Sequence, residues 1–274
     1  MAYTVAFTQH HGKNRQYPKQ QDCLWNGLDV LQERDLIAAS YVTDQQRLVI
    51  AVADGVGSSP RAELASYCVL QAMACEIAVG ADFNMGLIRR IHGKLCDAYA
   101  KGRTFGSATT LAAAELNDNR CVILNVGDSR VYRISAEGVW QQLSHDHTII
   151  NAMIESGEAE AGRDYGLFLH SLDSCLVADD DYTDFAIHRA ETLLQPGDSL
   201  LLCTDGVHDS LPEAIFHQLF DSMLTPAAQV ERWRQAVLDA GAPGEHASAE
   251  LLLVAQPQVD SARAGICRLL SGST

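Results

Sequence analysis

LVIAVADGVG, residues 48–57, and LLLCTDGVHD, residues 200–209, are the two stretches that decide the fold of this chain. Each is a run of β-prone apolar residues that ends at Asp-Gly, a pattern that predicts a buried strand. Asp54 and Asp205 then stand where their strands end, and the following glycine lets the backbone turn sharply. Two carboxylates held on rigid strands are suited to a pair of hard divalent cations, and two-metal centres cleave phosphate esters. Either Asp-Gly taken alone also fits an ordinary turn.

Three further segments surround this pair. CVILNVGDSRVYRI at 121–134 predicts a β-hairpin with Gly127-Asp128-Ser129 at its turn. GSATTLAAAEL at 106–116 predicts a strand opened by a turn of small residues. Asp22 lies in QQDCLWN, just before the first core strands. Together these segments make an isolated turn an insufficient explanation for Asp54 and Asp205.

Six segments, taken in order, resemble the metal-dependent PPM (PP2C-type) serine/threonine protein phosphatases, and most of all the bacterial members. They are QQDCLW, VADGVGSSPRAELAS, GSATTLAAAEL, LNVGDSRVYRI, LSHDHTI and LLLCTDGVHDSL. The resemblance covers about residues 5–254. It implies an α+β fold, an αββα sandwich in which two antiparallel sheets are flanked by helices. The phosphatase domain would occupy residues 1–256, with residues 257–274 as a C-terminal tail.

The resemblance also implies a set of site residues. Asp22, Asp54 and Asp205 would be catalytic, in the hydrolysis of phosphate monoesters by a metal-activated water. Asp54 would bridge two Mg²⁺ or Mn²⁺ ions, the carbonyl of Gly55 would bind one of them, and Asp205 the other. Asp22 would orient water beside the ions. Asp146 stands where bacterial members hold a third ion; the alternative for Asp146 is a helix N-cap.

Three positions depart from the family pattern. Glu245 replaces the last metal-binding Asp, and His246 replaces the Asn that follows it. Glutamate keeps the charge with a longer reach, so it either remains a ligand or weakens one site, and His246 could ligate instead. The family's phosphate-binding arginine falls on Tyr17 here. Arg15 is the candidate substitute because a guanidinium clamps phosphate in bidentate fashion, and a solvated surface arginine is the alternative.

Composition limits the possible partners and compartment. The 274-residue chain carries a formal net charge of −15, which argues against nonspecific binding to nucleic acid or to an anionic membrane. There is no apolar run of about 18 residues and no secretory signal. Eight scattered cysteines without a CxxC pair indicate reduced thiols in the cytoplasm. We expect a cytoplasmic monomer that acts on phosphoproteins and opposes a Ser/Thr kinase.

Periodicity and turn residues predict the remaining elements. We expect a helix opened by Ser58-Ser59-Pro60 and a second one beginning near Asn84. Further helices are predicted at about 146–156, 212–221 and 226–240, and a last core strand at 251–256. The acidic stretch at about 158–185 falls where bacterial members have a flap beside the active site, or it is a solvated loop.

Two other functions are compatible with these residues. One is a non-catalytic pseudophosphatase that binds phosphoproteins or regulatory partners. It draws its support from Glu245, His246 and the displaced arginine, whereas the presence of Asp22, Asp54 and Asp205 argues against it. The other is a two-metal hydrolase of small phosphate esters.

Overall fold

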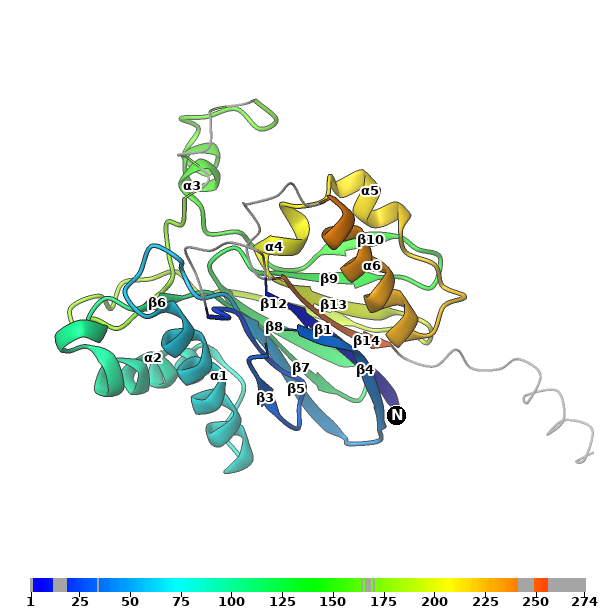
Figure 1. Cartoon of the computed structure of the whole chain (residues 1–274), viewed down its shortest axis with the longest axis horizontal. Coiled ribbons are helices and arrows are strands. Elements are labelled where there is room, and N and C mark those ends of the chain that lie inside the picture. Colours follow the sequence, from blue (N-terminus) through cyan, green and yellow to red (C-terminus); the bar gives the residue numbers. More distant parts are fainter. Residues whose placement is uncertain are drawn as a thin grey trace, which may run out of the picture.

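The computed structural model describes residues 2–11, 19–33, 35–163, 165, 169, 171–240 and 249–255. Two six-stranded sheets lie face to face, and helices cover the outer face of each (Figure 1). Every strand pairing in the two sheets is antiparallel. The αββα sandwich predicted from the sequence is therefore the observed architecture.

The first sheet brings together strands from both ends of the chain. In spatial order its strands are β10 (Trp140–Gln142), β9 (Arg130–Ile134), β13 (Ser199–Cys203), β14 (Ala249–Ala255), β1 (Tyr3–His10) and β4 (Asp35–Thr43). The last strand predicted from the sequence is thus central to the sheet, because β14 lies between β13 and β1.

The second sheet is built from the middle of the chain. Its strands in spatial order are β12 (His188–Leu193), β8 (Arg120–Val126), β7 (Leu111–Asn117), β5 (Arg47–Ala53), β2 (Cys23–Trp25) and β3 (Val30–Leu31). A separate two-stranded ribbon pairs β11 (Leu176–Val177) with β6 (Ala108–Thr109).

Among the described residues, two pairs of helices cover the outer faces of the sheets, and two further helices lie elsewhere (Figure 1). They are α1 (Ala62–Ala78), α2 (Met85–Tyr99), α3 (Ile149–Ser156), α4 (Asp205–His208), α5 (Glu213–Gln218) and α6 (Pro226–Ala240), with a short 3₁₀ turn, η1, at Gly102–Thr104. The helices α1 and α2 cover the second sheet, whereas α5 and α6 cover the first.

The continuous apolar run of β5 follows from burial of the strand on both faces. Alternate residues face the space between the sheets and the layer of α1 and α2. The inner residues are Leu48, Ile50 and Val52, and the outer ones are Val49, Ala51 and Ala53. On the other side of the sandwich, Trp233 and Phe216 pack with Tyr132 between the first sheet and its helices. The sandwich thus has three apolar layers, and the strands that carry the site lie between two of them.

The predicted hairpin at 121–134 is wrong. β8 pairs with β7 and β12 in the second sheet, whereas β9 pairs with β10 and β13 in the first. Gly127-Asp128-Ser129 therefore carries the chain from one sheet to the other. A glycine turn between two β-prone runs fits both arrangements, since local sequence does not say which sheet the second strand joins.

Most helix limits agree with the sequence, but α3 begins at Ile149 rather than near residue 146, and α5 ends at Gln218 rather than near residue 221. The start of α1 also differs. Arg61 is its N-cap and provides no capping side chain, while the Oγ of Ser59 accepts a 3.0 Å hydrogen bond from the Ala108 amide. The predicted cap at Ser58-Ser59-Pro60 is therefore wrong. Asn84 caps α2 through its side chain, and Gly157 ends α3 with a φ of 79°, both as predicted.

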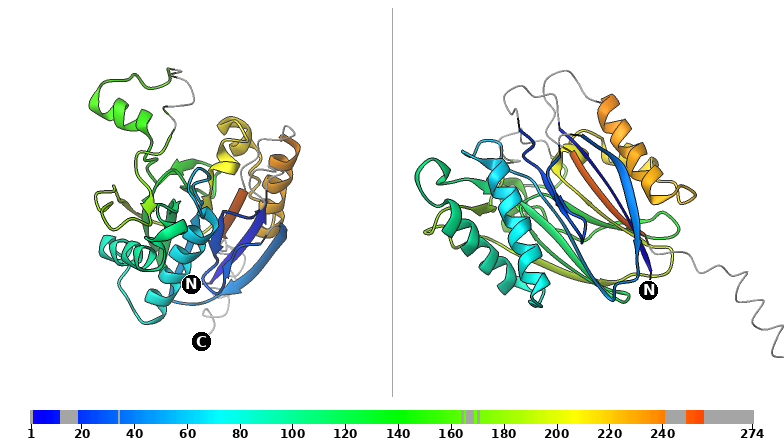
Figure 2. Two further views of the ribbon diagram at one scale, coloured as in Figure 1. Left: turned by 60° about the vertical axis from the view of Figure 1, so that its left-hand side comes forward. Right: turned by 60° about the horizontal axis from the view of Figure 1, so that its bottom comes forward.

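α3 and the chain after it stand out from the sandwich (Figures 1 and 2). This projecting part contains the start of the acidic stretch at 158–185, and β11 ties the later part of the stretch back to the body. Its role as a flap stays a prediction.

The described cysteines are free thiols. Cys23, Cys96, Cys121 and Cys203 are buried, as the sequence indicates, whereas Cys75 is exposed. In the part of the chain that the structure describes, no helix is both long and apolar enough to cross a membrane.

Candidate active site

Asp54 and Asp205 lie at the strand ends where the sequence places them. Asp54 follows the last residue of β5, and Asp205 opens α4 one residue beyond Thr204, which follows β13. The two strands belong to opposite sheets, yet the carboxyl groups of Asp54 and Asp205 lie close enough for each to affect the pKa of the other. The sandwich therefore brings together two acids that are 151 positions apart in the sequence (205 − 54).

Asp22 joins this pair from the segment before β2. It is 2% exposed, and the hydroxyl of Thr204 donates to its Oδ2 at 2.8 Å. Thr204 thus links the strand end that carries Asp205 to the carboxyl of Asp22. The negative charge of Asp22 in turn raises the pKa of Asp54.

Asp128 is a fourth acid that acts on Asp54 and Asp205, and the sequence did not predict it as a site residue. Burial raises its pKa to about 6, while the neighbouring His208 opposes that rise. The charge of Asp128 raises the pKa values of Asp54 and Asp205. A signal for it was present, because the apolar run of β8 also ends at a glycine and an aspartate, here in the order Gly-Asp instead of Asp-Gly. Its interpretation as a hairpin turn hid the likeness.

The electrostatics of these acids show strong mutual repulsion. Burial, followed by the charge of Asp22, raises the pKa of Asp54 well above its ordinary value. Burial and the charges of Asp54 and Asp128 do the same for Asp205. Like charges in a buried site favour the protonated form unless positive charge is supplied. We call Asp22, Asp54, Asp128 and Asp205 the carboxylate cluster.

The carboxylate cluster fits hard divalent cations. Oδ1 of Asp205 is buried and has no hydrogen-bond partner among the described residues, which is costly unless another ligand meets it. The donors are all carboxylate oxygens, which such cations prefer. No three His, Cys, Asp or Glu side chains of the described residues are already spaced as a closed ligand set. Glu245, the predicted last ligand, lies outside those residues.

Gly55 is held where a side chain would not fit. A Cβ there would come within 2.6 Å of the Ala62 carbonyl oxygen and 2.7 Å of the Gln21 carbonyl oxygen. The Gly55 amide also donates to the Gln21 carbonyl at 3.2 Å. The backbone beside Asp54 is thus fixed against the start of α1 and the segment before Asp22. Metal binding by the Gly55 carbonyl stays a prediction.

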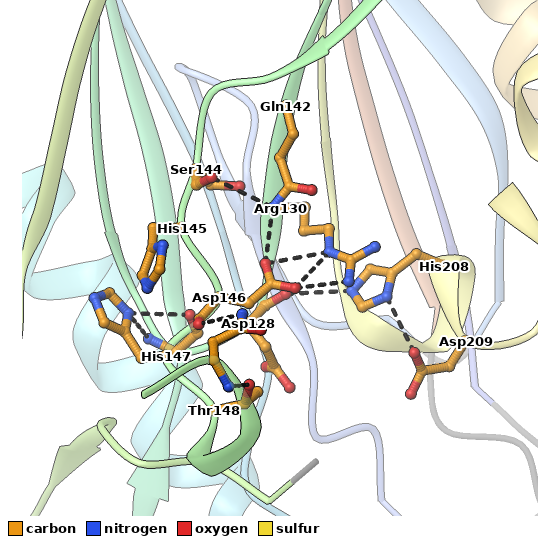
Figure 3. Close-up of polar contacts among 12 residues, drawn as sticks. Asp128, Arg130, Gln142, Ser144, His145, Asp146, His147, Thr148, His208 and Asp209 are labelled. Carbon is orange, nitrogen blue, oxygen red and sulfur yellow. Dashed lines mark hydrogen bonds and ion pairs between the residues drawn. The ribbon is translucent and has the colours of Figure 1, made fainter. Parts of the chain in front are cut away.

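Asp146 is paired within the chain (Figure 3). Its carboxylate accepts from Nε of Arg130 at 2.9 Å and from a terminal guanidinium nitrogen at 2.6 Å, and Gln142 adds a 2.9 Å hydrogen bond. Burial alone would lower the pKa of Arg130, but its hydrogen bonds with Asp146 raise it. The N-cap of α3 is Thr148, so the capping alternative for Asp146 is wrong. A third ion at Asp146 stays a prediction.

Three histidines near this pair have structural contacts. The imidazole of His147 bonds to the backbone of Gly127, and the residue is buried, with 7% of its surface exposed. His145 is partly exposed beside Glu155. His208 bonds the carbonyl of Asp128 at 3.2 Å and so supports the crossing between sheets (Figure 3).

Arg15, the candidate phosphate ligand, lies outside the described residues, as do Tyr17 and His246. The structure therefore leaves the predictions about the phosphate-binding arginine and the last metal ligand as they were.

Comparison with known proteins agrees with this geometry. The family model described as Protein phosphatase 2C matches residues 31–240. The chain belongs to this family. Serine/threonine phosphatase stp of Listeria innocua is 28% identical over 192 residues, which are 66% of this chain and 75% of that protein. Family membership and this relative support the catalytic interpretation over the pseudophosphatase.

Solved structures confirm the fold. The Mycobacterium tuberculosis serine/threonine phosphatase PstP/Ppp superposes with a TM-score of 0.74 at 20% identity, covering 94% of this chain and 100% of that one. The catalytic domain of the phosphatase PstP in complex with two manganese ions superposes with a TM-score of 0.67 at 18% identity, covering 92% and 98%. At these identities the likeness establishes the αββα sandwich.

Proposed function

We propose that this protein is a metal-dependent phosphatase of phosphoserine and phosphothreonine in proteins, and that the carboxylate cluster is its active site. One observation carries the proposal. Acids from both sheets converge, the pKa values of the partly buried Asp54 and Asp205 are raised, and Asp205 Oδ1 has no partner among the described residues. Such an arrangement is unfavourable by itself and becomes favourable when cations bind.

The cations would be Mg²⁺ or Mn²⁺, two in number, with a third as a further option. Asp54, Asp205 and the Gly55 carbonyl would hold them, joined by Asp128 and by Glu245. The solved relative with two manganese ions supports this choice. Bound divalent cations neutralise the phosphate and lower the pKa of water that attacks phosphorus.

Neighbouring hydroxyl groups hold Asp22 and the backbone of Asp54 in position. Thr204 fixes the rotamer of Asp22, so that this carboxyl can accept a hydrogen bond from water at the cluster. The backbone of Asp54 is fixed by Thr109, whose hydroxyl donates to the Asp54 carbonyl at 2.8 Å. Fixed donors reduce the reorganisation needed when charge develops during hydrolysis.

The substrates would be phosphoproteins, with a Ser/Thr kinase as the opposing enzyme. The named phosphatases among the relatives support this class of substrate. Arg15 would bind the phosphate through its guanidinium.

Hydrolysis of a phosphothreonine peptide and of p-nitrophenyl phosphate tests the proposal. We expect turnover with Mn²⁺ that disappears with EDTA and in Asp54→Asn. Asp44→Asn is the matched control, because Asp44 is exposed in the turn before β5, at the end of that strand away from Asp54.

Peptide binding without turnover at any Mn²⁺ concentration would contradict the enzyme and support a pseudophosphatase. A strong preference for the small ester would instead assign a small-molecule hydrolase. Loss of activity in Asp44→Asn equal to that in Asp54→Asn would show that the assay does not report on the carboxylate cluster.

A further inference from the structure

Two buried hydroxyl groups connect the segments that carry Asp54 and Asp128. Thr110 follows β6, and Ser129 follows Asp128 in the crossing between the sheets. Thr110 is 2% exposed and Ser129 is fully buried, and their oxygens lie 2.7 Å apart. A short hydrogen bond between two buried side chains fixes the distance between the segments that carry them.

Thr110 holds Asp54 at two points. The Thr110 amide donates to the Asp54 carbonyl at 2.8 Å, and the Asp54 amide donates to the Thr110 hydroxyl oxygen at 3.0 Å. The same oxygen bonds to Ser129, so one hydroxyl joins the Asp54 backbone to the crossing. Removing it would leave the Asp54 amide without this acceptor.

The methyl group of Thr110 fixes the other side of the crossing. Gly127 has a φ of +94°, and a Cβ there would lie 2.7 Å from both Cβ and Cγ2 of Thr110. Thr110 therefore packs beneath the Gly127 backbone while its hydroxyl reaches Ser129. These contacts leave little freedom for Asp128, which lies between the two.

We propose that the Thr110–Ser129 pair is a positioning unit that sets the separation of Asp54 and Asp128 and thereby the affinity of the site for divalent cations. The inference rests on the proposed function, since it assumes that the carboxylate cluster binds metal. Residues that orient metal ligands from behind are worth about 10- to 100-fold in metal affinity.

Calorimetric titration of Mn²⁺ into the metal-free full-length protein tests the pair. Thr110→Val removes the hydroxyl and keeps the packing against Gly127, and Ser129→Ala removes the other partner. We expect each to weaken Mn²⁺ binding roughly 10-fold or more. The double variant should be little weaker than Thr110→Val alone, because Thr110→Val already lacks the hydrogen bond that Ser129→Ala removes.

Two further variants separate positioning from general damage. Thr110→Ser keeps the hydroxyl and should retain wild-type affinity within about two-fold. Thr8→Val is the matched control, because Thr8 is 1% exposed and its hydroxyl donates to the Leu36 carbonyl at 2.6 Å, outside the site. Thermal melts of the metal-free proteins check folding, and if Thr110→Val does not fold, Ser129→Ala and Thr110→Ser decide.

The outcomes are distinct. Wild-type protein that takes up no Mn²⁺ would overturn both this inference and the proposed function. Wild-type binding with unchanged affinity in Thr110→Val and Ser129→Ala would overturn the positioning role alone. Equal weakening in Thr8→Val would also overturn it, because any lost buried hydroxyl would then have the same effect.

Discussion

The carboxylate cluster and the Arg130–Asp146 pair are neighbouring groups of acids that the chain treats differently. Asp146 receives a bidentate guanidinium from within the fold, with Nε of Arg130 3.2 Å from Oδ1 and a terminal nitrogen 2.6 Å from Oδ2. Among the described residues, no ion pair joins Asp54 or Asp205 to a lysine or arginine. Burial and neighbouring acids raise their pKa values, Asp22 and Asp128 acting on Asp54, and Asp54 and Asp128 on Asp205. The difference indicates that positive charge is built in at Asp146, whereas at the carboxylate cluster it is left to ions from solution.

The largest expected effect is the loss of Asp205, one of the proposed metal ligands. Asp205→Asn should lower phosphopeptide turnover with Mn²⁺ by more than about 100-fold, since removal of even an outer contact costs up to that factor. Initial rates across a Mn²⁺ series measure it. Glu191→Gln, at the exposed Arg120 pair, serves as the control. Near-normal turnover in Asp205→Asn would mean that the carboxylate cluster does not depend on bound cations, and would remove its contrast with Asp146.

Breaking the built-in pair should instead destabilise the fold. Asp146→Asn leaves the guanidinium of Arg130 partly buried without its charge partner, at a cost of about 3 kcal/mol or more. Urea denaturation of the metal-free protein measures the change. Glu191→Gln should cost less than about 1 kcal/mol in the same experiment, because exposed pairs contribute little. If Asp146→Asn lowers the free energy of unfolding by as little as Glu191→Gln does, the Arg130–Asp146 pair does not stabilise the fold as proposed.

The sequence could predict the ends of β5 and β13 because each apolar run stops at the acid that matters. It could not predict Asp128 as a partner. The turn that holds Asp128 has the same residues whether β9 returns beside β8 or crosses to the other sheet, and only long-range pairing with β13 decides. The partnership of Asp146 with Arg130 is equally invisible, since it depends on where β9 ends up in the first sheet.

The predicted cap at the start of α1 was wrong for a related reason. Ser59 has a hydroxyl that could cap a helix, but in the fold this oxygen accepts from Ala108 in the β6 segment. A tertiary contact replaced the local one. Asn84 has no such competing partner among the described contacts, and the helix begins there as predicted, with the Asn84 side chain accepting from the Leu87 amide.

Removing one of the repelling acids should change the free energy of unfolding in the opposite direction to Asp146→Asn. In metal-free protein, Asp54→Asn removes one charge from a group of mutually repelling acids, so the free energy of unfolding should rise by about 1–2 kcal/mol while activity is lost. The experiment is urea denaturation in EDTA. A loss of stability similar to that of Asp146→Asn would show that the cluster is neutralised from within.

The smallest expected effect is a pH dependence from Asp128. Its pKa is raised to about 6 in the fold, so the folded protein binds more protons than the unfolded chain between about pH 4 and pH 6. Its contribution to stability is therefore present below about pH 4 and is lost as the pH rises through 6. Unfolding in EDTA at several pH values measures this, with the difference between wild type and Asp128→Asn isolating the residue. A difference that does not change with pH would contradict the raised pKa.

Anomalous scattering from a crystal of the wild-type protein soaked in Mn²⁺ would show whether divalent cations neutralise the carboxylate cluster. We expect manganese peaks bound by the carboxylates of Asp54 and Asp205, with Asp146 still held by Arg130. A map without manganese at the carboxylate cluster, or with a lysine or arginine side chain neutralising those acids instead, would contradict this expectation.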